Sequence, residues 1–401
     1  MFAPLTGRTV IDLTQVLAGP YCSYQLALLG ATVIKVEPPE GGDWARSGGG
    51  DAELGAAGMG VGYLTQGGGK KSVAIDLKTE AGKALVLEMT GKADVFLENF
   101  RPGTAERLGL GVDAIMGLNS GIVYASLSAY GHDGPMSARP AYDHVIQAVS
   151  GIMQLTGDPD TLPNKVGAPY VDYATGQNGA LAVLAALMER DRTGEGQRVD
   201  VSMLDSSLLL MASHMTGYLT TGNEPKASGN NAFSGSPTSG VFETADGLLA
   251  LAANNDRQFP RLLKAIDRDD LATDPRFANA DGRKKHTDAL QAELAETFRS
   301  DTANSWETRF ATADVPAGRV RGLAEAVDME QVASRGLMAD YTLPKLNRRI
   351  SVPTIGFKAN GDVIRAKTPP PHLGQDTETV LAEFGKTPED IAQLKATGAI
   401  R

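Results

Sequence analysis

Short apolar runs alternate with helix-like segments through the first 130 residues, and this alternation restricts the chain to few folds. Runs rich in Val, Ile and Leu are typical of buried strands, and helical spacing follows several of them. Strands that alternate with helices form a mostly parallel sheet with helices on both faces. We therefore expect an α/β fold. The predicted strands are residues 9–13, 32–37, 72–77, 93–100 and 122–130, and the clearest helices are 21–29 and 80–90.

A Gly-rich segment interrupts this alternation at residues 41–69. Glycine populates turn conformations freely and weakens helices and strands, so we expect a mobile loop here.

The second half of the chain differs from the first in composition and in its predicted elements. Residues 221–239 are rich in Gly, Ser, Asn and Pro and read as a linker. A hairpin turned at Asp246 and Gly247 follows, and then amphipathic helices around 258–265, 283–298 and 305–312. We predict a large domain over 1–221, a smaller α+β domain over 222–321, and a segment over 322–401 that returns to the large domain.

Composition excludes several classes of protein. The chain has 38 basic and 48 acidic residues and a formal net charge of -10, which disfavours nucleic acid as a partner. Cys22 is the single cysteine, so no disulfide framework forms within the chain. The longest strongly apolar stretch, 180–188, is too short to span a membrane, and the first residues do not resemble a signal peptide. We expect a cytoplasmic protein.

One acidic residue, Asp172, lies where an extended segment becomes a long apolar helix, predicted from Tyr173 to Arg190. The early turns of this helix carry small residues such as Gly176 and Gly179, which leave room for a ligand or another backbone. Two interpretations of the carboxylate are open. It caps the helix by accepting a backbone hydrogen bond, or it is a nucleophile.

Several cofactor and metal signatures are absent from the sequence. No GxGxxG follows the first strand, so a dinucleotide-dependent dehydrogenase lacks its fingerprint and Glu37 is a weak ribose ligand. The GGGKKS run at 67–72 resembles a phosphate loop, but Lys71 replaces the hydroxyl residue that would hold magnesium. No HExxH motif and no cysteine pair are present. We therefore predict no metal and no permanently bound cofactor.

Five segments, in this order, resemble the class III CoA-transferase family, the formyl-CoA transferase and CaiB/BaiF group. One such motif is weak evidence, and five in the right order are specific. The segments are VIDLTQVLAGPY through GGDWAR (10–46), GGGKKS through ENFRPG and GLG (67–111), YGHDGP through GDP (130–159), VDYATG through LDSSL (171–208) and HLGQDTETVL (372–381).

The resemblance implies that Asp172 is the family's aspartate nucleophile. Its carboxylate would attack an acyl-CoA thioester, and CoA would pass through a covalent aspartyl intermediate to an incoming carboxylic acid. CoA and acyl-CoA are then substrates rather than cofactors. The resemblance also implies a Rossmann-like large domain, a smaller domain and an interlocked homodimer.

Further site residues follow from the same resemblance. Tyr142 and Asp143 would line the acyl pocket, together with Leu17 and the backbone of the AGP turn at Ala18 and Gly19. The phosphates of CoA need cations, and four are candidates: Arg101, Lys70, Lys71 and Arg46.

The chain departs from the formyl-CoA transferase pattern at three places. Leu17 replaces a glutamine, Pro38 replaces a CoA-binding arginine, and residues 252–259 replace a glycine run. These changes argue against oxalate and formyl-CoA as the substrate pair, and we expect a succinyl-CoA-like donor and a short dicarboxylic acceptor. The Asn254, Asn255 and Asp256 stretch either gates the site or is a plain solvent loop.

Two alternatives stay open. The family includes α-methylacyl-CoA racemases, which use a histidine and an aspartate as an acid-base pair. Here Tyr142 stands at the histidine position, His144 is two residues out of register, and the GHD at 131–133 belongs to an upstream loop. The other alternative is a CoA-binding protein without catalytic activity.

Overall fold

The computed structural model describes residues 2–231 and 234–401, and the chain divides into two compact units. The first unit contains residues 1–152, 165–222 and 330–401, and the second contains 153–164 and 223–329. The predicted divisions were at 221/222 and 321/322. The observed division returns to the first unit eight residues later, and residues 153–164 belong to the second unit.

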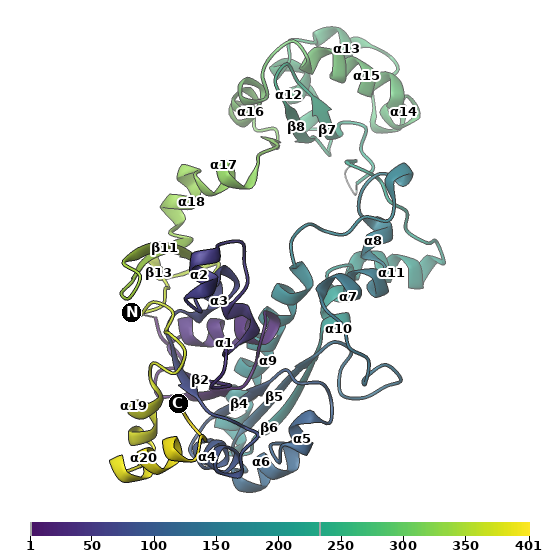
Figure 1. Cartoon of the computed structure of the whole chain (residues 1–401). Coiled ribbons are helices and arrows are strands. Elements are labelled where there is room, and N and C mark those ends of the chain that lie inside the picture. The colour runs from purple at the N-terminus through teal and green to yellow at the C-terminus, as the bar shows by residue number, and fades with distance from the viewer. Residues whose placement is uncertain (1, 232–233) are drawn as a thin grey trace. The chain divides into compact units, whose positions relative to one another are not determined.

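A six-stranded parallel sheet forms the centre of the first unit (Figure 1). Its strand order is β3-β2-β1-β4-β5-β6, the order of doubly wound nucleotide-binding folds. This confirms the predicted α/β class with a mostly parallel sheet. The strands are β1 (Thr9–Asp12), β2 (Thr32–Glu37), β3 (Lys70–Ala74), β4 (Val95–Glu98), β5 (Val123–Ser128) and β6 (Gln197–Ser202).

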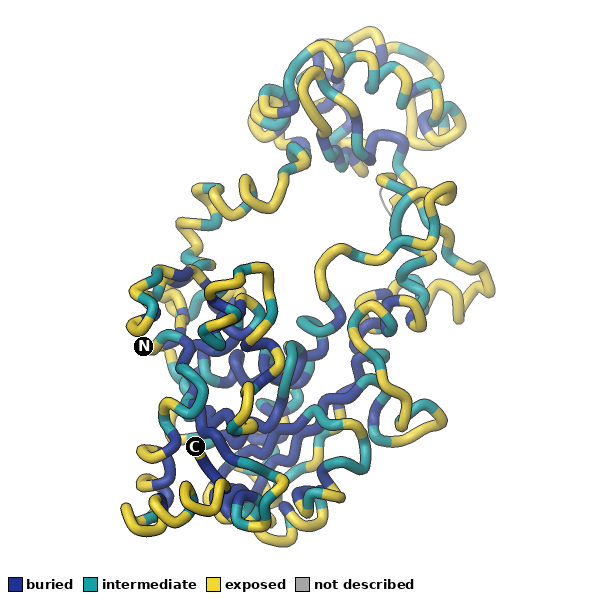
Figure 2. Tube along the Cα trace, viewed as in Figure 1, coloured by how far each residue is buried: buried dark blue, intermediate teal, exposed yellow. Residues whose placement is uncertain are grey.

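Neighbouring residues of a strand point to opposite faces of the sheet. Because both faces here carry apolar side chains, helices cover both of them. Val10 packs in one core with α1 (Ala18–Leu28) and α9 (Tyr170–Thr193), while Ile11 packs in another with α4 (Glu80–Thr90). Figure 2 shows the strands of this sheet as largely buried. The second core also contains residues of α6 (Val112–Leu118), α19 (Thr377–Glu383) and α20 (Pro388–Ala396).

Small residues let α1 and α9 approach closely. A Cβ atom on Gly176 would lie 2.7 Å from the Ala18 carbonyl oxygen, and one on Gly179 would lie 3.1 Å from Cys22 Sγ. Both distances are closer than ordinary packing allows. The small residues of the long helix thus make room for another backbone, one of the two uses that the sequence indicates.

The Gly-rich segment is more ordered than the sequence predicts, and the prediction of a loop is wrong for much of its length. It contains the 3-10 turn η1 (Trp44–Arg46) and the helices α2 (Ala52–Ala56) and α3 (Val61–Gly67). Glycines in left-handed conformations, such as Gly49 and Gly58, make the turns. Leu54, Met59 and Tyr63 pack in a core with the hairpin of β10 (Met338–Leu343) and β11 (Arg348–Pro353), which the sequence did not predict.

The last residues of the chain cover the edge strand β3. Ile400 pairs with Ile75 in an antiparallel bridge, and the Asp76 amide donates to the Ala399 carbonyl at 2.9 Å. The Ser72 amide donates to Asp376 Oδ2 at 2.8 Å. The returning segment therefore completes the sheet of the first unit.

The remaining elements of the first unit are short. Its other helices are α5 (Thr104–Arg107), α7 (Asp143–Ser150), α10 (Met203–Leu209), α11 (Ala212–Thr221) and α18 (Glu330–Arg335). Its other strands form two hairpins, β10 (Met338–Leu343) with β11 (Arg348–Pro353), and β12 (Lys358–Ala359) with β13 (Asp362–Val363). The second of these turns at Asn360 and Gly361. The helix α8 (Ile152–Leu155) begins at the last residue before the first boundary.

The second unit has an antiparallel three-stranded sheet and its own aromatic core. The sheet contains β7 (Ser239–Glu243), β8 (Leu248–Ala252) and β9 (Ala317–Arg319). Phe298, Trp306 and Phe310 pack together in its core. The helices are η2 (Pro159–Thr161), α12 (Gln258–Ala265), α13 (Asp269–Thr273), α14 (Ala280–Lys285), α15 (Thr287–Phe298), α16 (Ala303–Thr312) and α17 (Leu323–Val327).

Among the described residues, none of the helices combines the length and the apolar character that crossing a bilayer requires.

Candidate functional site

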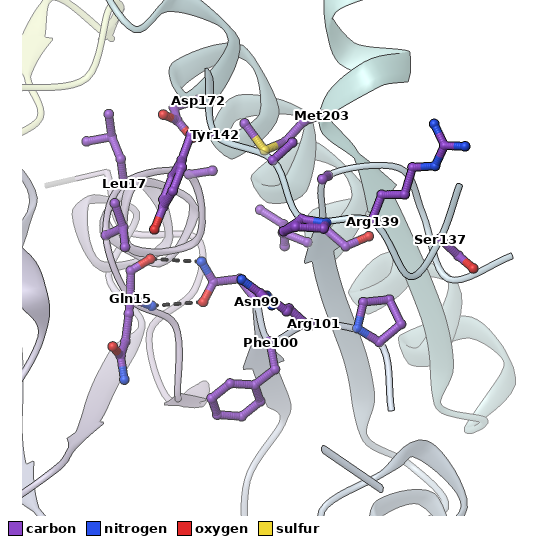
Figure 3. A pocket seen from close by; sticks show the side chains of 18 residues that line it. Gln15, Leu17, Asn99, Phe100, Arg101, Ser137, Arg139, Tyr142, Asp172 and Met203 are labelled. Atoms are coloured by element: carbon purple, nitrogen blue, oxygen red, sulfur yellow. Dashed lines mark hydrogen bonds between the residues drawn. The ribbon is translucent and has the colours of Figure 1, made fainter. Parts of the chain in front are cut away.

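A cavity opens at the carboxyl ends of the central strands of the first unit (Figure 3). Its volume is about 190 Å³. Ligands bind at this edge in open α/β sheets because the loops that follow the strands converge there. Three loops contribute to the wall, and α9 adds Asp172. The lining residues include Gln15–Ala18 after β1, Asn99–Pro102 after β4, Leu127–Ala129 at the end of β5, and Ser137, Arg139–Tyr142, Asp172 and Met203.

Asp172 lies in the first turn of α9, which begins at Tyr170, three residues earlier than predicted. The helix therefore does not use Asp172 as its N-cap, and its N-cap residue, Pro169, makes no side-chain capping bond. Asp143 from α7 has this role instead. Its Oδ2 accepts hydrogen bonds from the Val171 amide at 2.8 Å and the Asp172 amide at 3.3 Å.

The Asp172 carboxylate itself accepts no hydrogen bond from the described part of the chain. Burial raises the pKa of Asp172 to about 7, and the negative charge of Asp143 adds to this shift. A carboxylate that lines a cavity, lacks donors and has a raised pKa is a strong base and nucleophile for a carboxyl group.

Reciprocal hydrogen bonds join two walls of the cavity. Asn99 Oδ1 accepts from the Gln15 amide at 2.9 Å, and Asn99 Nδ2 donates to the Gln15 carbonyl at 2.8 Å (Figure 3). The loop after β1 is thereby fixed to the loop after β4. Neither residue was predicted as a site residue, although Asn99 lies near the end of the predicted strand 93–100, in the ENFRPG motif, and directly follows β4 in the structure.

Five of the predicted site residues meet at this cavity, namely Asp172, Tyr142, Leu17, Ala18 and Arg101. Tyr142 is 66% exposed, so its side chain lines the cavity without closing it off from solvent.

Arg139 is an additional cation that the sequence analysis did not single out. It is exposed, as Arg101 is. The signal for Arg139 was its place in the RPAYDH segment that contains Tyr142.

Lys70 is buried under α1 and does not line the cavity. Its Nζ donates to Ser23 Oγ at 2.7 Å and to the Pro20 carbonyl at 2.9 Å, and it pairs with Asp12 at 3.2 Å. Burial lowers the pKa of Lys70 to about 8, although the Asp12 charge opposes the shift. The three donors of the ammonium are matched by three acceptors within the protein.

Arg46 is also buried, and its guanidinium forms a two-pronged pair with Glu37 at 2.6 and 2.7 Å. Glu37, the weak ribose candidate, is thus occupied by this pair. Lys71 is partly exposed and pairs with Glu383 of α19 at 2.7 Å. The structure does not bring Arg46, Lys70 or Lys71 to the cavity.

Two other predicted residues act behind the wall. Gly19 is buried, and a Cβ there would lie 2.4 Å from Thr14 Cβ, so the close turn requires glycine. Asp143 does not line the cavity either, but its bonds to α9 orient the turn that presents Asp172.

A buried polar pair lies behind the loop after β4. Glu98 Oε2 accepts from the Phe100 amide at 2.7 Å, while Glu98 Oε1 lies 3.7 Å from His132 Nε2. Burial raises the pKa of Glu98 to about 7. His132, from the GHD run, does not line the cavity, and His144 is exposed on α7.

The second unit has a separate cavity of about 370 Å³, lined in part by Asn254, Asn255 and Asp256. Asn254 Oδ1 accepts hydrogen bonds from Ser234 at 2.7 Å and from Ser239 at 2.6 Å, and Asp256 pairs with Arg283. The stretch is therefore tied into its own unit by side-chain bonds.

Within residues 2–231 and 234–401, no group of three or more His, Cys, Asp or Glu side chains is placed to hold a metal ion. The reactive groups that line the first cavity are the Asp172 carboxylate, the backbone of the Leu17 turn and the exposed Arg101 and Arg139.

This chain is similar over most of its length to known CoA-transferases. The model of CoA-transferase family III matches residues 5–377. The succinate–glutarate CoA-transferase of Agrobacterium fabrum is 36% identical over 390 residues, covering 95% of this chain and 96% of that protein. The acetyl-CoA:oxalate CoA-transferase of Acetobacter aceti is 38% identical over 336 residues, covering 84% and 85%.

A solved structure is also similar over nearly the whole chain. The crystal structure of a CAIB/BAIF family protein from Brucella suis superposes with a TM-score of 0.85 at 32% identity. The match covers 96% of this chain and 100% of that one.

Proposed function

Because this chain belongs to CoA-transferase family III, we propose that it moves CoA between an acyl-CoA thioester and a small carboxylic acid through a covalent intermediate on Asp172. The observation that carries the proposal is the placement of Asp172. Among the described residues it is the one carboxylate on the cavity wall and it accepts no hydrogen bond, and burial raises its pKa.

The reaction would proceed by acyl exchange at this carboxylate. An Asp172 oxygen attacks the thioester carbonyl, the C–S bond breaks, and a mixed anhydride and CoA thiolate form. The thiolate then attacks the Asp172 carbonyl carbon, which releases the donor acid and leaves an aspartyl-CoA thioester. The incoming carboxylate repeats the two steps in reverse and leaves with CoA, which restores Asp172.

Both intermediates are activated acyl groups that water would hydrolyse, so the site must stay dry during turnover. A cavity of about 190 Å³ suits a small acid and the reacting end of the thioester rather than the whole of CoA. We propose that Tyr142 and Leu17 border the acyl group, while amides at the start of α1 face its carbonyl oxygen.

The phosphates of CoA need exposed cations at the rim of the cavity. Arg101 meets this requirement, and Arg139 is a second rim cation that the site adds. The internal bonds of Lys70 and Arg46 favour a structural role for both, since a phosphate would have to compete with buried carboxylates.

For the substrates, we propose a succinyl-CoA-like donor and a short dicarboxylic acceptor. The name of the Agrobacterium fabrum relative, a succinate–glutarate CoA-transferase, supports this choice. The Acetobacter aceti relative is named for oxalate, so oxalate belongs in the acceptor panel although Leu17 and Pro38 depart from the formyl-CoA transferase pattern.

We also propose a homodimer, as the family resemblance implies. Apolar side chains that a monomer would leave in water support it. Leu181 is 65% exposed and Met188 is 75% exposed at a spacing of seven residues on α9, and Leu219 of α11 is 80% exposed. Sedimentation velocity at micromolar concentration tests this, and a monomer at all concentrations would contradict it.

The catalytic proposal is tested with labelled succinate and succinyl-CoA, followed by a panel of other acids that includes glutarate and oxalate. The native enzyme should transfer label into the thioester, and hydroxylamine should trap a hydroxamate at Asp172 in the peptide mass spectrum. Asp172→Ala should lose both signals while retaining its fold. Asp113→Ala, at an exposed carboxylate in the first turn of α6, is the matched control.

Other outcomes would point elsewhere. Exchange of the α-proton of the thioester with deuterated water, without acid transfer, would indicate the racemase alternative. CoA binding with neither reaction would indicate a protein that binds CoA without catalysis. Full label transfer by Asp172→Ala would falsify the covalent mechanism.

A further inference from the structure

Val16 adopts a left-handed backbone conformation on the cavity wall, with φ at +74°. A β-branched residue rarely occupies this region because its Cβ substituents clash with the backbone. Such a conformation persists only where the surroundings impose it.

Buried or partly buried side chains from four segments hold the backbone around Val16. Each segment contributes a side chain that reaches a backbone polar group between residues 14 and 16. Lys35 Nζ donates to the Thr14 carbonyl at 2.7 Å, Asn99 bonds both polar groups of Gln15, Asp43 Oδ1 accepts from the Val16 amide at 3.0 Å, and Gln66 Nε2 donates to the Val16 carbonyl at 2.7 Å.

Asp43 and Gln66 hold the two sides of Val16 itself, and each is only 1% exposed. Asp43 also forms an ion pair with Lys35 at 2.9 Å, so its carboxylate cannot rotate without breaking a buried charge pair. Gln66 Oε1 has no hydrogen-bond partner among the described residues. The hydrogen bond from Nε2 to the Val16 carbonyl is therefore the one side-chain bond that Gln66 makes among the described residues.

The Val16 carbonyl fixes the next peptide plane. In a trans peptide the C=O and the following N–H point in opposite directions. With its carbonyl held by Gln66 of α3, Val16 directs the Leu17 amide to the other side of the chain. Leu17 and Ala18 then enter α1, whose first amides have no acceptor within the helix. Both residues line the cavity together with Asp172.

We propose that Gln66 and Asp43 are positioning residues, which impose the left-handed conformation of Val16 and so hold the Leu17–Ala18 turn against Asp172. The inference rests on the proposed CoA transfer for its kinetic consequence. Its structural part, the constraint on Val16, is independent of the reaction. Gln66 belongs to the Gly-rich segment, so that segment has a defined task at the site.

The kinetic test removes the Gln66 donor and then restores backbone freedom. Gln66→Met, which keeps the length of the side chain, should lower kcat about tenfold while KM for the thioester changes less than about twofold, because the turn loses its alignment and not its contacts. Glycine adopts positive φ without strain, so adding Val16→Gly to Gln66→Met should recover about threefold or more of the lost kcat.

Val16→Ala is the matched control for this rescue. Alanine removes the same side chain but keeps the steric penalty at positive φ, so Val16→Ala with Gln66→Met should show no recovery. Equal behaviour of the Gly and Ala double variants, or an unchanged kcat in Gln66→Met, would overturn the proposal.

A stability measurement covers the case in which Gln66→Met does not fold. At ordinary φ angles, alanine gives a more stable protein than glycine, and a left-handed residue reverses this order. With Gln66 retained, Val16→Gly should therefore melt at a higher temperature than Val16→Ala. The opposite order overturns the proposal even if the enzyme transfers CoA normally. Absence of CoA transfer in the native protein, with the melting order as expected, would contradict the proposed function alone.

Discussion

The carboxylate of Asp143 lies against the backbone amide of Asp172, with Oδ2 3.3 Å from that nitrogen. One group therefore acts on its neighbour in two ways. It satisfies the start of α9 and so fixes the direction of the first turn, and its negative charge adds to the burial that raises the pKa of Asp172. Four predictions follow for the site and its support.

The rate of CoA transfer should rise with pH through about 7. Burial and the Asp143 charge raise the pKa of Asp172 to about 7, so the carboxylate binds a proton as the pH falls below that value and loses its nucleophilicity. At one pH unit below the midpoint, kcat/KM should be about a tenth of its plateau. Initial rates from pH 5.5 to 8.5 measure this profile.

Asp143→Asn keeps an acceptor for α9 but removes the charge, so the midpoint of its pH profile should move to lower pH. An unmoved midpoint would show that Asp143 does not influence the titration.

Replacing Asp172 by asparagine should stabilise the protein at high pH. A carboxyl group whose folded pKa lies above its unfolded value costs stability once the pH is above the folded pKa, and this cost fades as the pH falls towards the unfolded value. For a rise from 3.8 to about 7, at about 1.4 kcal/mol per unit, Asp172→Asn should gain on the order of 2–4 kcal/mol at pH 8 and little at pH 4. Urea unfolding at the two pH values compares them. A gain independent of pH would contradict the assignment.

Substituting Gly176 by alanine should force α1 and α9 apart. The new Cβ would lie 2.7 Å from the Ala18 carbonyl oxygen, so we expect a loss of about 1–3 kcal/mol in the free energy of unfolding. Gly117→Ala in α6 is the matched control, because nothing lies within 4 Å of its Cβ and alanine favours helices by about 0.5–1 kcal/mol. Chemical denaturation should therefore give opposite signs for the two variants.

We expect Lys70 to stabilise the fold and Arg101 to bind the thioester substrate. Lys70→Met leaves the buried Asp12 without its partner, so unfolding should become easier by about 3–5 kcal/mol. Arg101→Gln, at an exposed side chain on the cavity, should change stability by less than about 0.5 kcal/mol while raising KM for the thioester. Thermal melts and steady-state kinetics on both variants test this. A stable Lys70→Met enzyme with a raised KM would instead return Lys70 to the CoA site.

Local patterns in the sequence predicted the parallel sheet and a long helix beginning near Asp172. Both depend on short-range signals: apolar runs that alternate with helical spacing, and a motif at a helix start. The helix α12 has the predicted bounds, Gln258–Ala265, because its apolar residues repeat at helical spacing.

Long-range pairing could not be predicted in the same way. The sequence shows that Lys70 and Arg46 are positively charged, but it does not show that buried carboxylates bind them. In a sequence, such a structural cation cannot be distinguished from a cation that binds phosphate. The helix cap from Asp143 is also a contact between distant residues. In the Gly-rich segment, composition outweighed the few apolar residues, such as Tyr63, that anchor its helices to a hairpin near the other end of the chain.

The antiparallel bridge between Ile75 and Ile400 has a consequence for how the protein is made. During synthesis, strand β3 leaves the ribosome more than 300 residues before the segment that covers its edge. Until then its unpaired backbone is open to association with other nascent chains. We expect that the first unit matures only after residue 400 has been synthesised, and that chaperone dependence is greatest before that point.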